Sequence, residues 1–266
     1  MLEFPHGVFG IALGVSTGFV FLFVLFGSLL DRAGAGNYFI QVAFSLMGHM
    51  KGGPAKAAVV SSAMTGLISG SSIANVVTTG TFTIPLMKKV GFSSEKAGAV
   101  EVASSVNGQI MPPVMGAAAF LMVEYVGIPY FDVVKHAFLP AVISYIALVY
   151  IVHLEALKAG MEGLPRAYVP KPIVQRLIGI AFTIAAICAI SFIVYYGMGW
   201  IRPAFPNVAG YIIFAFLTLV YVGLLYVASR EEPLELDDPN APVTALPLPG
   251  PTIRSGLHFI LPVVVL

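Results

Sequence analysis

The chain has 266 residues, of which 58% are hydrophobic and 10% are charged, and its formal net charge is +1. Soluble domains carry about a quarter charged residues, so this composition excludes a soluble globular protein and indicates an integral membrane protein. The balanced charge gives no argument for nucleic acid as a partner. A single cysteine, Cys188, excludes an internal disulfide and a cysteine-based zinc cluster.

Long uncharged runs mark the membrane spans, because a helix needs about 20 apolar residues to cross a bilayer. Residues 1–36 contain the first span, and residues 136–229 contain three more, in the runs 137–152, 177–201 and 208–228. Residues 230–256 predict a Pro-rich acidic loop. An apolar run over 257–266 predicts the start of a further helix, and we expect the chain to be a fragment of a longer protein. The fold class is an all-α polytopic membrane protein with about five to six transmembrane helices.

Residues 37–56 predict an amphipathic helix followed by a loop. Apolar side chains repeat there at helical spacing, with polar side chains in a stripe between them: Phe39, Val42, Leu46 and Met50 against Gln41, Ser45, Gly48 and His49. This pattern is typical of a helix lying in the membrane interface. A short connecting helix packed on other spans is the alternative.

The uncharged run Ala57–Met87 is 31 residues long, which is too long for one span and too short for two simple ones. If it is a re-entrant hairpin over 57–87, the Lys and Arg residues divide 12 to 2 between the two sides of the membrane, whereas a single crossing divides them 5 to 9. Cytoplasmic loops carry the excess of Lys and Arg, so the count favours the hairpin. It also places the N-terminus outside.

Two polar interruptions fall at membrane depth within residues 57–123. One is Gly70–Asn75 at the centre of the hairpin, and the other is Ser104–Gln109 in a broken helix over 97–123, just before Pro112-Pro113. Because proline disrupts the preceding turn, we expect free carbonyl groups around Gly108 and Gln109. Carbonyl and hydroxyl oxygens without a carboxylate suit Na⁺, and half-helix N-termini suit a substrate carboxylate. Ordinary helix packing by small polar residues is the competing interpretation, and Glu101 is interpreted as a charge at the rim of its span.

The same segments resemble a known family. The stretches Gly66–Asn75, Ile84–Phe92 and Asn107–Pro113 resemble the first hairpin, its exit and the next broken helix in the large membrane subunit (DctM-like permease) of TRAP transporters. The form VNGQIMPPVMGAAAFLM is most similar to the fused permeases that work with TAXI-type binding proteins.

The resemblance implies a sodium-coupled importer of organic carboxylates that works by an elevator motion in a bacterial or archaeal inner membrane. The implied partners are a periplasmic TAXI-type binding protein, a small membrane subunit or its fused equivalent, and the remainder of the permease with a second hairpin. The implied Na⁺ ligands are Ser71, Ser72, Asn75, Asn107 and Gly108. Residues expected near the substrate are Thr78, Thr79 and Ser105.

Two other functions compete with a carrier. An intramembrane serine protease needs a histidine base beside its serine, but all five histidines fall at or outside the ends of the predicted spans, so we do not expect an enzyme. A passive channel or a structural membrane subunit remains as an alternative. A channel is expected to show polar stripes along whole helices, whereas here polarity is confined to two breaks.

Overall fold

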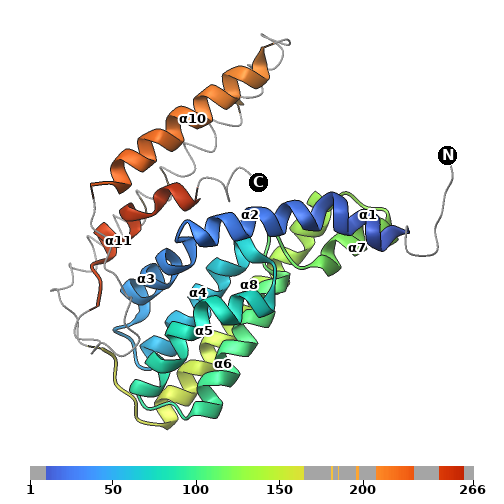
Figure 1. Ribbon diagram of the computed structural model, residues 1–266. Helices are drawn as coiled ribbons and strands as arrows, with labels where there is room; N and C mark the ends of the chain where they lie inside the picture. Colours follow the sequence, from blue (N-terminus) through green and yellow to red (C-terminus); the bar gives the residue numbers. More distant parts are fainter. Residues whose placement is uncertain are drawn as a thin grey trace. The chain divides into compact units, whose positions relative to one another are not determined.

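The computed structural model describes residues 10–164, 208–230 and 246–260, together with residues 181, 185, 196 and 197. Every regular element in these ranges is helical, which confirms the predicted all-α fold class (Figure 1). Three helices of the described residues are long and apolar enough to cross a membrane: Leu13–Arg32, Tyr130–Lys158 and Ala209–Ala228. The predicted span 177–201 lies almost wholly outside the described residues.

The chain divides into two compact units. Residues 1–167 and 231–266 form the first, and residues 168–230 form the second. In the second unit, α10 (Ala209–Ala228) covers the predicted span 208–228. All residues of the predicted hairpin and broken helix belong to the first unit, and the following description concerns that unit.

The first span is one continuous helix made of three consecutive pieces. These are α1 (Ile11–Val15), a π-helical turn over Ser16–Val20, and α2 (Phe21–Arg32). Most side chains of α2 are exposed, as expected for a helix that faces lipid or a further protein segment.

Helix α3 (Ala35–Met47) corresponds to the predicted amphipathic helix, but it is buried on nearly every side. It contacts α2, α4, α5 and α11, and its polar residues Gln41 and Ser45 are as buried as Phe39 and Val42. Leu46 is exposed instead. This burial fits the alternative of a connecting helix packed on other helices. Its depth in the membrane stays a prediction.

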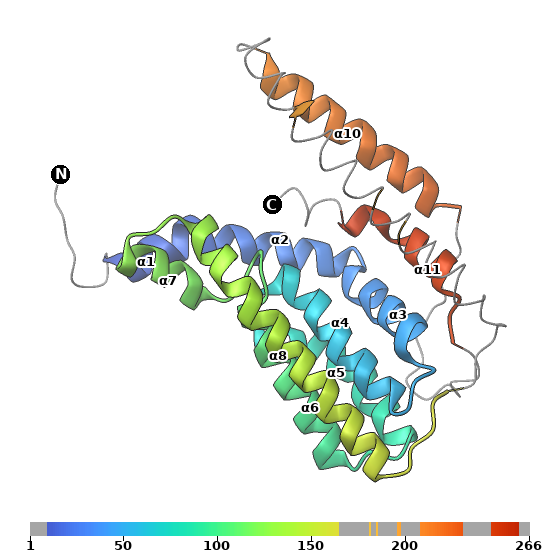
Figure 2. The same cartoon turned by 180° about the vertical axis from the view of Figure 1, so that it is seen from behind.

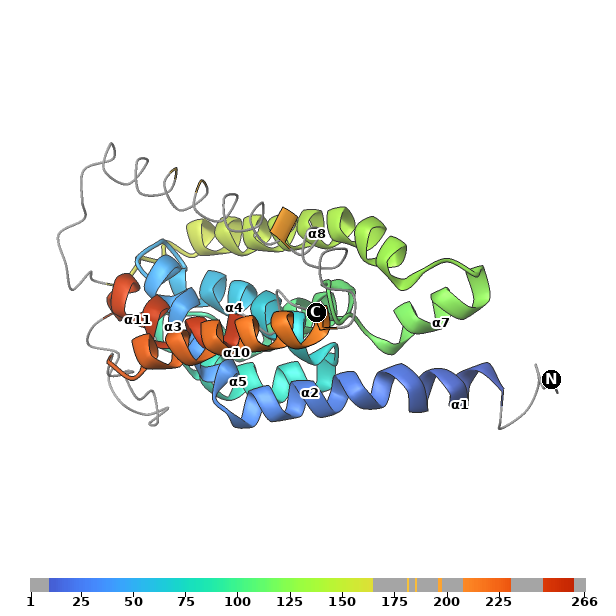
Figure 3. The ribbon, with the colours of Figure 1, turned by 90° about the horizontal axis from the view of Figure 1, so that it is seen from above.

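The predicted hairpin is formed by α4 (Gly53–Ser69) and α5 (Ser72–Lys89), which pack against each other with only two residues between them. Helix α4 is central, because it contacts α2, α3, α5, α6 and α8. Figures 2 and 3 show it enclosed by these neighbours. Its buried side chains are mostly small, and small residues let helix backbones approach closely: Ala55, Ala57, Ala58, Ser61, Ser62 and Gly66.

The predicted broken helix is interrupted from Gly108 onward, whereas Ser104–Asn107 of the predicted interruption are still helical. Helix α6 (Ser94–Asn107) is followed by a 3₁₀ turn over Gly108–Ile110, six non-α-helical residues, and α7 (Ala117–Val126). Helix α8 (Tyr130–Lys158) then runs back along α4 and α6.

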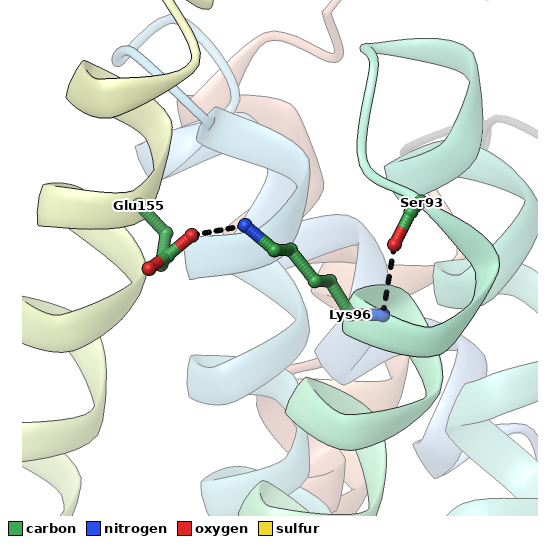
Figure 4. A network of polar contacts seen from close by, with 3 residues as sticks. All are labelled: Ser93, Lys96 and Glu155. Atoms are coloured by element: carbon green, nitrogen blue, oxygen red, sulfur yellow. Dashed lines mark hydrogen bonds and ion pairs between the residues drawn. The ribbon is translucent and has the colours of Figure 1, made fainter.

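Figure 4 shows two polar contacts at the N-terminal end of α6, a helix cap and an ion pair with α8. Ser93 caps α6, since its Oγ accepts a hydrogen bond from the backbone N–H of Lys96 at 3.3 Å. The Lys96 ammonium forms an ion pair with Glu155 of α8. Both side chains are more than a third exposed, so solvent weakens this pair.

Part of the stretch predicted as a loop over 230–256 is a helix. Helix α11 (Pro249–Ser255) has proline in its first turn and packs on α3, where the Tyr38 hydroxyl donates to the carbonyl of Ile253 at 2.9 Å. Proline is tolerated in the first helical turn because its missing N–H has no partner there. The prediction of a loop is therefore wrong for these residues.

Candidate functional site

The break between α4 and α5 forms the tip of the hairpin. Gly70 ends α4 with a φ of +58°, a left-handed conformation that glycine adopts without a steric penalty. Ser71 then caps α5, because its Oγ accepts a hydrogen bond from the N–H of Ala74 at 3.3 Å. A Cβ on Gly70 would lie 2.0 Å from the carbonyl oxygen of Met115, after the double proline. The hairpin tip therefore lies directly against the broken helix.

Two further contacts join these segments. The Gln109 side chain donates from Nε2 to the hydroxyl of Ser72 at 2.8 Å. On the other arm, a Cβ on Gly66 would lie 2.8 Å from the Cα of Gly108, so the backbones touch at this pair of glycines. Both arms of the hairpin are thus held against the turn that follows α6.

Asn75 is the buried polar residue at this junction. Its Oδ1 accepts a hydrogen bond from the Thr65 hydroxyl, and its Nδ2 donates to the carbonyl of Ser62 at 3.0 Å. The same Nδ2 lies 3.0 Å from the place where a Cβ on Gly108 would be. Asn75 therefore connects α5, α4 and the broken helix.

The five predicted Na⁺ ligands are arranged around this junction. Ser72, Asn75 and Gly108 make the contacts just described, Ser71 caps α5, and Asn107 is the half-buried last residue of α6. All five come from the tip and the broken helix, which the structure brings together. Their role as ligands stays a prediction.

The expectation of free carbonyl groups around Gly108 and Gln109 is wrong. The Gly108 oxygen accepts a hydrogen bond from the N–H of Met111 at 3.2 Å, and the Gln109 oxygen accepts one from the N–H of Gly116 at 2.7 Å. The chain curls back after the 3₁₀ turn, which brings these donors to the carbonyls that the proline leaves without a helical partner. Each oxygen keeps a second lone pair with which it could bind a cation.

A pocket of about 200 Å³ lies between α2 and the hairpin tip. Its polar lining consists of hydroxyl, amide and carboxylate groups: Ser28, Asp31, Thr65, Ser69, Ser71, Asn75 and Thr78. The Thr78 hydroxyl donates to Asp31 Oδ2 at 3.5 Å. Asp31 is not among the predicted site residues, because no sequence pattern indicates which face of the hairpin α2 contacts. Such oxygen atoms can hold a cation or a polar ligand.

Of the three residues expected near a substrate, the structure brings Thr79 and Ser105 together but not Thr78. Thr78 is half-buried and lines the pocket beside α2, whereas Thr79 of α5 and Ser105 of α6 are fully buried. The hydroxyls of Thr79 and Ser105 both donate to the carboxylate of Glu101. Thr78 and Thr79 are consecutive residues of α5, so their side chains point in directions about 100° apart around the helix.

The interpretation of Glu101 as a rim charge is wrong, because the side chain is fully buried. Its Oε1 accepts hydrogen bonds from Thr79, from Ser105 at 3.3 Å and from Ser62 at 3.5 Å, and its Oε2 accepts one from Thr83 at 2.5 Å. The sequence contains a pattern that could have indicated this cluster of hydroxyl groups around Glu101. Thr79 and Thr83 share one helix face, and so do Glu101 and Ser105, because each pair is four residues apart.

Comparison with known proteins identifies the family. Residues 6–234 match the family "Tripartite ATP-independent periplasmic transporter, DctM component". The chain belongs to the DctM family. This membership also confirms the prediction that the chain is not an enzyme, since the family consists of transporter components. With the three apolar helices, it supports a multi-pass protein of the inner membrane.

Individual relatives match shorter stretches. The chain is 34% identical over 91 residues to the C4-dicarboxylate TRAP transporter large permease protein DctM of Rhodobacter capsulatus, which covers 34% of this chain and 21% of the relative. It is 33% identical over 95 residues to the ectoine TRAP transporter large permease protein TeaC of Halomonas elongata, and this match covers 36% of this chain and 22% of the relative. It is 26% identical over 145 residues to the sialic acid TRAP transporter permease protein SiaT of Haemophilus influenzae, and this match covers 54% of this chain and 23% of the relative. The matched stretches thus cover less than a quarter of the length of each of these three relatives.

Proposed function

We propose that this chain supplies the first-hairpin part of the permease in a sodium-coupled TRAP transporter that imports organic carboxylates by an elevator motion. Family membership supports a TRAP-type secondary transporter, and the names of two relatives, for C4-dicarboxylate and sialic acid, support an acidic substrate. Because the matched stretches cover a minor part of each relative, transport requires the remainder of the permease.

The observation that carries this proposal is the junction between the hairpin tip and the broken helix. Asn75 and Ser72 of the tip meet Gly108 and Gln109 of the broken helix through side-chain and backbone contacts. Irregular backbone at membrane depth is tolerated where it is buried in protein or lines a water-filled cavity. Secondary transporters build their ion and substrate sites from such discontinuous helices.

The proposed assembly follows from the same assignment. The partners are a periplasmic binding protein of the TAXI type, a small membrane subunit or its fused equivalent, and a second hairpin from the remainder of the permease. We place the N-terminus outside, because this orientation puts 12 of the 14 Lys and Arg residues on the cytoplasmic side.

The test is the melting temperature of the complete permease in detergent, titrated with NaCl against choline chloride at equal ionic strength. An ion that binds only the folded state stabilises it by mass action, by about 2.7 kcal/mol at a concentration of 100 Kd. We expect a saturable stabilisation with NaCl that is lost in Asn75→Ala, which removes the buried amide at the junction.

The matched control is Thr81→Ala. Thr81 lies on the same helix and is exposed, and its hydroxyl donates to the Thr78 carbonyl within that helix. This variant should retain the full response to NaCl. Equal curves for NaCl and choline chloride in the wild-type permease would refute sodium coupling at this junction.

A further inference from the structure

Glu101 lies in a shell of hydroxyl groups supplied by three helices. Ser62 comes from α4, Thr79 and Thr83 come from α5, and Ser105 comes from α6 itself. Neither ion pair found in the described residues includes Glu101. A carboxyl group buried at membrane depth is costly to keep ionised without a cation, and such groups commonly carry protons in transporters.

The other charged groups on the packed helices are placed near the helix ends. Tyr145 of α8 is a titratable side chain packed against α6, and its hydroxyl donates to the carbonyl of Ser104 at 2.9 Å. The charged residues and histidines of α4, α5, α6 and α8 other than Glu101 lie in the first or last two turns of these helices: Lys56, Lys88, Lys89, Glu95, Lys96, Asp132, Lys135, His136, His153, Glu155 and Lys158. Lys56 at the start of α4 contacts His153 Nδ1 at 2.9 Å.

The hydroxyl shell can satisfy Glu101 in both protonation states. Thr79 Oγ1 lies 2.8 Å from the carbonyl of Asn75, and Thr83 Oγ1 lies 3.0 Å from the carbonyl of Thr79. Each hydroxyl has one proton and can give it either to the carboxylate or to its own helix. When Glu101 gains a proton, these hydroxyls can turn to the backbone carbonyls and accept the new O–H.

The space around the carboxyl is fitted to a glutamate. A Cβ on Gly80 of α5 would lie 3.1 Å from Glu101 Cγ, so the missing side chain at Gly80 makes room for the stem. The pocket beside α2 does not include Glu101 among its lining residues. Direct hydrogen bonds fill the shell, which favours a proton over a metal cation, since a cation would have to displace them.

The shell is also connected to the junction at the hairpin tip. Thr79 contacts both Glu101 and the carbonyl of Asn75, and the Ser62 carbonyl accepts a hydrogen bond from Asn75 Nδ2. If the Thr79 hydroxyl changes direction, its hydrogen bond to the carbonyl of Asn75 changes as well, and Asn75 is one of the residues proposed to bind Na⁺.

We propose that Glu101 is a proton-binding site of the transport region, which takes up a proton from water and releases it while the hydroxyl shell reorients. The proposal rests on the proposed transport function for its biological role. The proton adds to one carboxylate oxygen, and the protonated group then donates to one of the surrounding hydroxyls.

The test is infrared difference spectroscopy of the complete permease in detergent, recorded from mildly acidic to mildly alkaline pH in choline chloride without sodium. The probe is the proton itself, and the signal is the carbonyl stretch of a protonated, non-aqueous carboxyl group. We expect this band to appear and disappear with pH in the wild type and to be lost in Glu101→Gln, which keeps the shape of the side chain without the titration.

Two other variants keep the test decisive. Thr83→Val retains the volume but removes the donor to Oε2, so the midpoint of the band should move toward higher pH by on the order of one unit, the effect of losing one charge-assisted hydrogen bond. Glu155→Gln removes an exposed carboxyl group and should leave the band unchanged. A wild-type permease without a titrating band, or a band that survives in Glu101→Gln, would overturn the proposal. Since no sodium is present, failure of the sodium test above leaves this result unaffected.

Discussion

The contact between Gly66 and Gly108 predicts that Gly66→Ala weakens the first unit. A new Cβ would lie 2.8 Å from Gly108 Cα and 3.2 Å from its carbonyl oxygen, and both are backbone atoms that cannot rotate away. Overpacking of this kind costs about 1–3 kcal/mol. Replacing glycine in a helix interior by alanine regains roughly 0.5–1 kcal/mol of helix propensity. The net change expected is a destabilisation of about 0–2.5 kcal/mol.

Gly98→Ala is the matched control for this substitution. Gly98 also lies inside a helix, α6, but a Cβ there would meet no heavy atom within 4 Å. This variant gains the propensity term without the clash and should be slightly more stable than the wild type. The difference between the two variants in free energy of unfolding isolates the steric cost of about 1–3 kcal/mol.

The assay is chemical unfolding of the complete permease in detergent, followed by the loss of helical circular dichroism. The NaCl titration of the melting temperature is repeated on both variants. Displacing Gly108 by Gly66→Ala should also reduce the response to NaCl. If Gly66→Ala is as stable as Gly98→Ala, α4 and the broken helix are not in contact as described, and the reasoning about the junction fails.

Two further predictions concern topology and the surface. Lys51 before α4 and Lys89 at the end of α5 are both exposed at the open end of the hairpin. Single cysteines at these positions should therefore both react with a membrane-impermeant reagent from the cytoplasmic side. Labelling from opposite sides would show that the segment crosses the membrane once. Lys96→Ala should lower the free energy of unfolding by less than about 1 kcal/mol, because the ion pair with Glu155 is exposed; a larger loss in the same unfolding assay would show that this pair is shielded from water in the complete permease.

The sequence indicates that both helices break, because the causes are local, but it places the second break too early, since α6 continues to Asn107. Gly70 and Ser71 supply a left-handed residue and a helix cap, and Pro112-Pro113 cannot continue a helix. The residues that interrupt each helix are neighbours in the chain. A reader of the sequence can therefore locate the breaks without knowing the tertiary packing.

The burial of Glu101 could not be located in this way. Its hydrogen-bond partners on the hairpin lie 39, 22 and 18 positions away in the chain, so only tertiary packing brings them together. Glu101 stands close to the predicted end of an uncharged run, where a charge at the membrane surface is the simplest interpretation. The burial of the polar stripe on α3 could not be located for a similar reason, since a polar stripe can face water or polar neighbours.

The central position of α4 has a consequence for biogenesis. This helix has 17 residues and is not among the described helices that are both long and apolar enough to cross a bilayer. Its buried face is completed by α6 and α8, and α8 ends at Lys158, about 90 residues further along the chain. During synthesis, α4 and α5 therefore leave the ribosome well before the helices that cover them. Stable insertion of the hairpin has to wait for those later helices, or for a membrane chaperone that shields its polar side chains in the meantime.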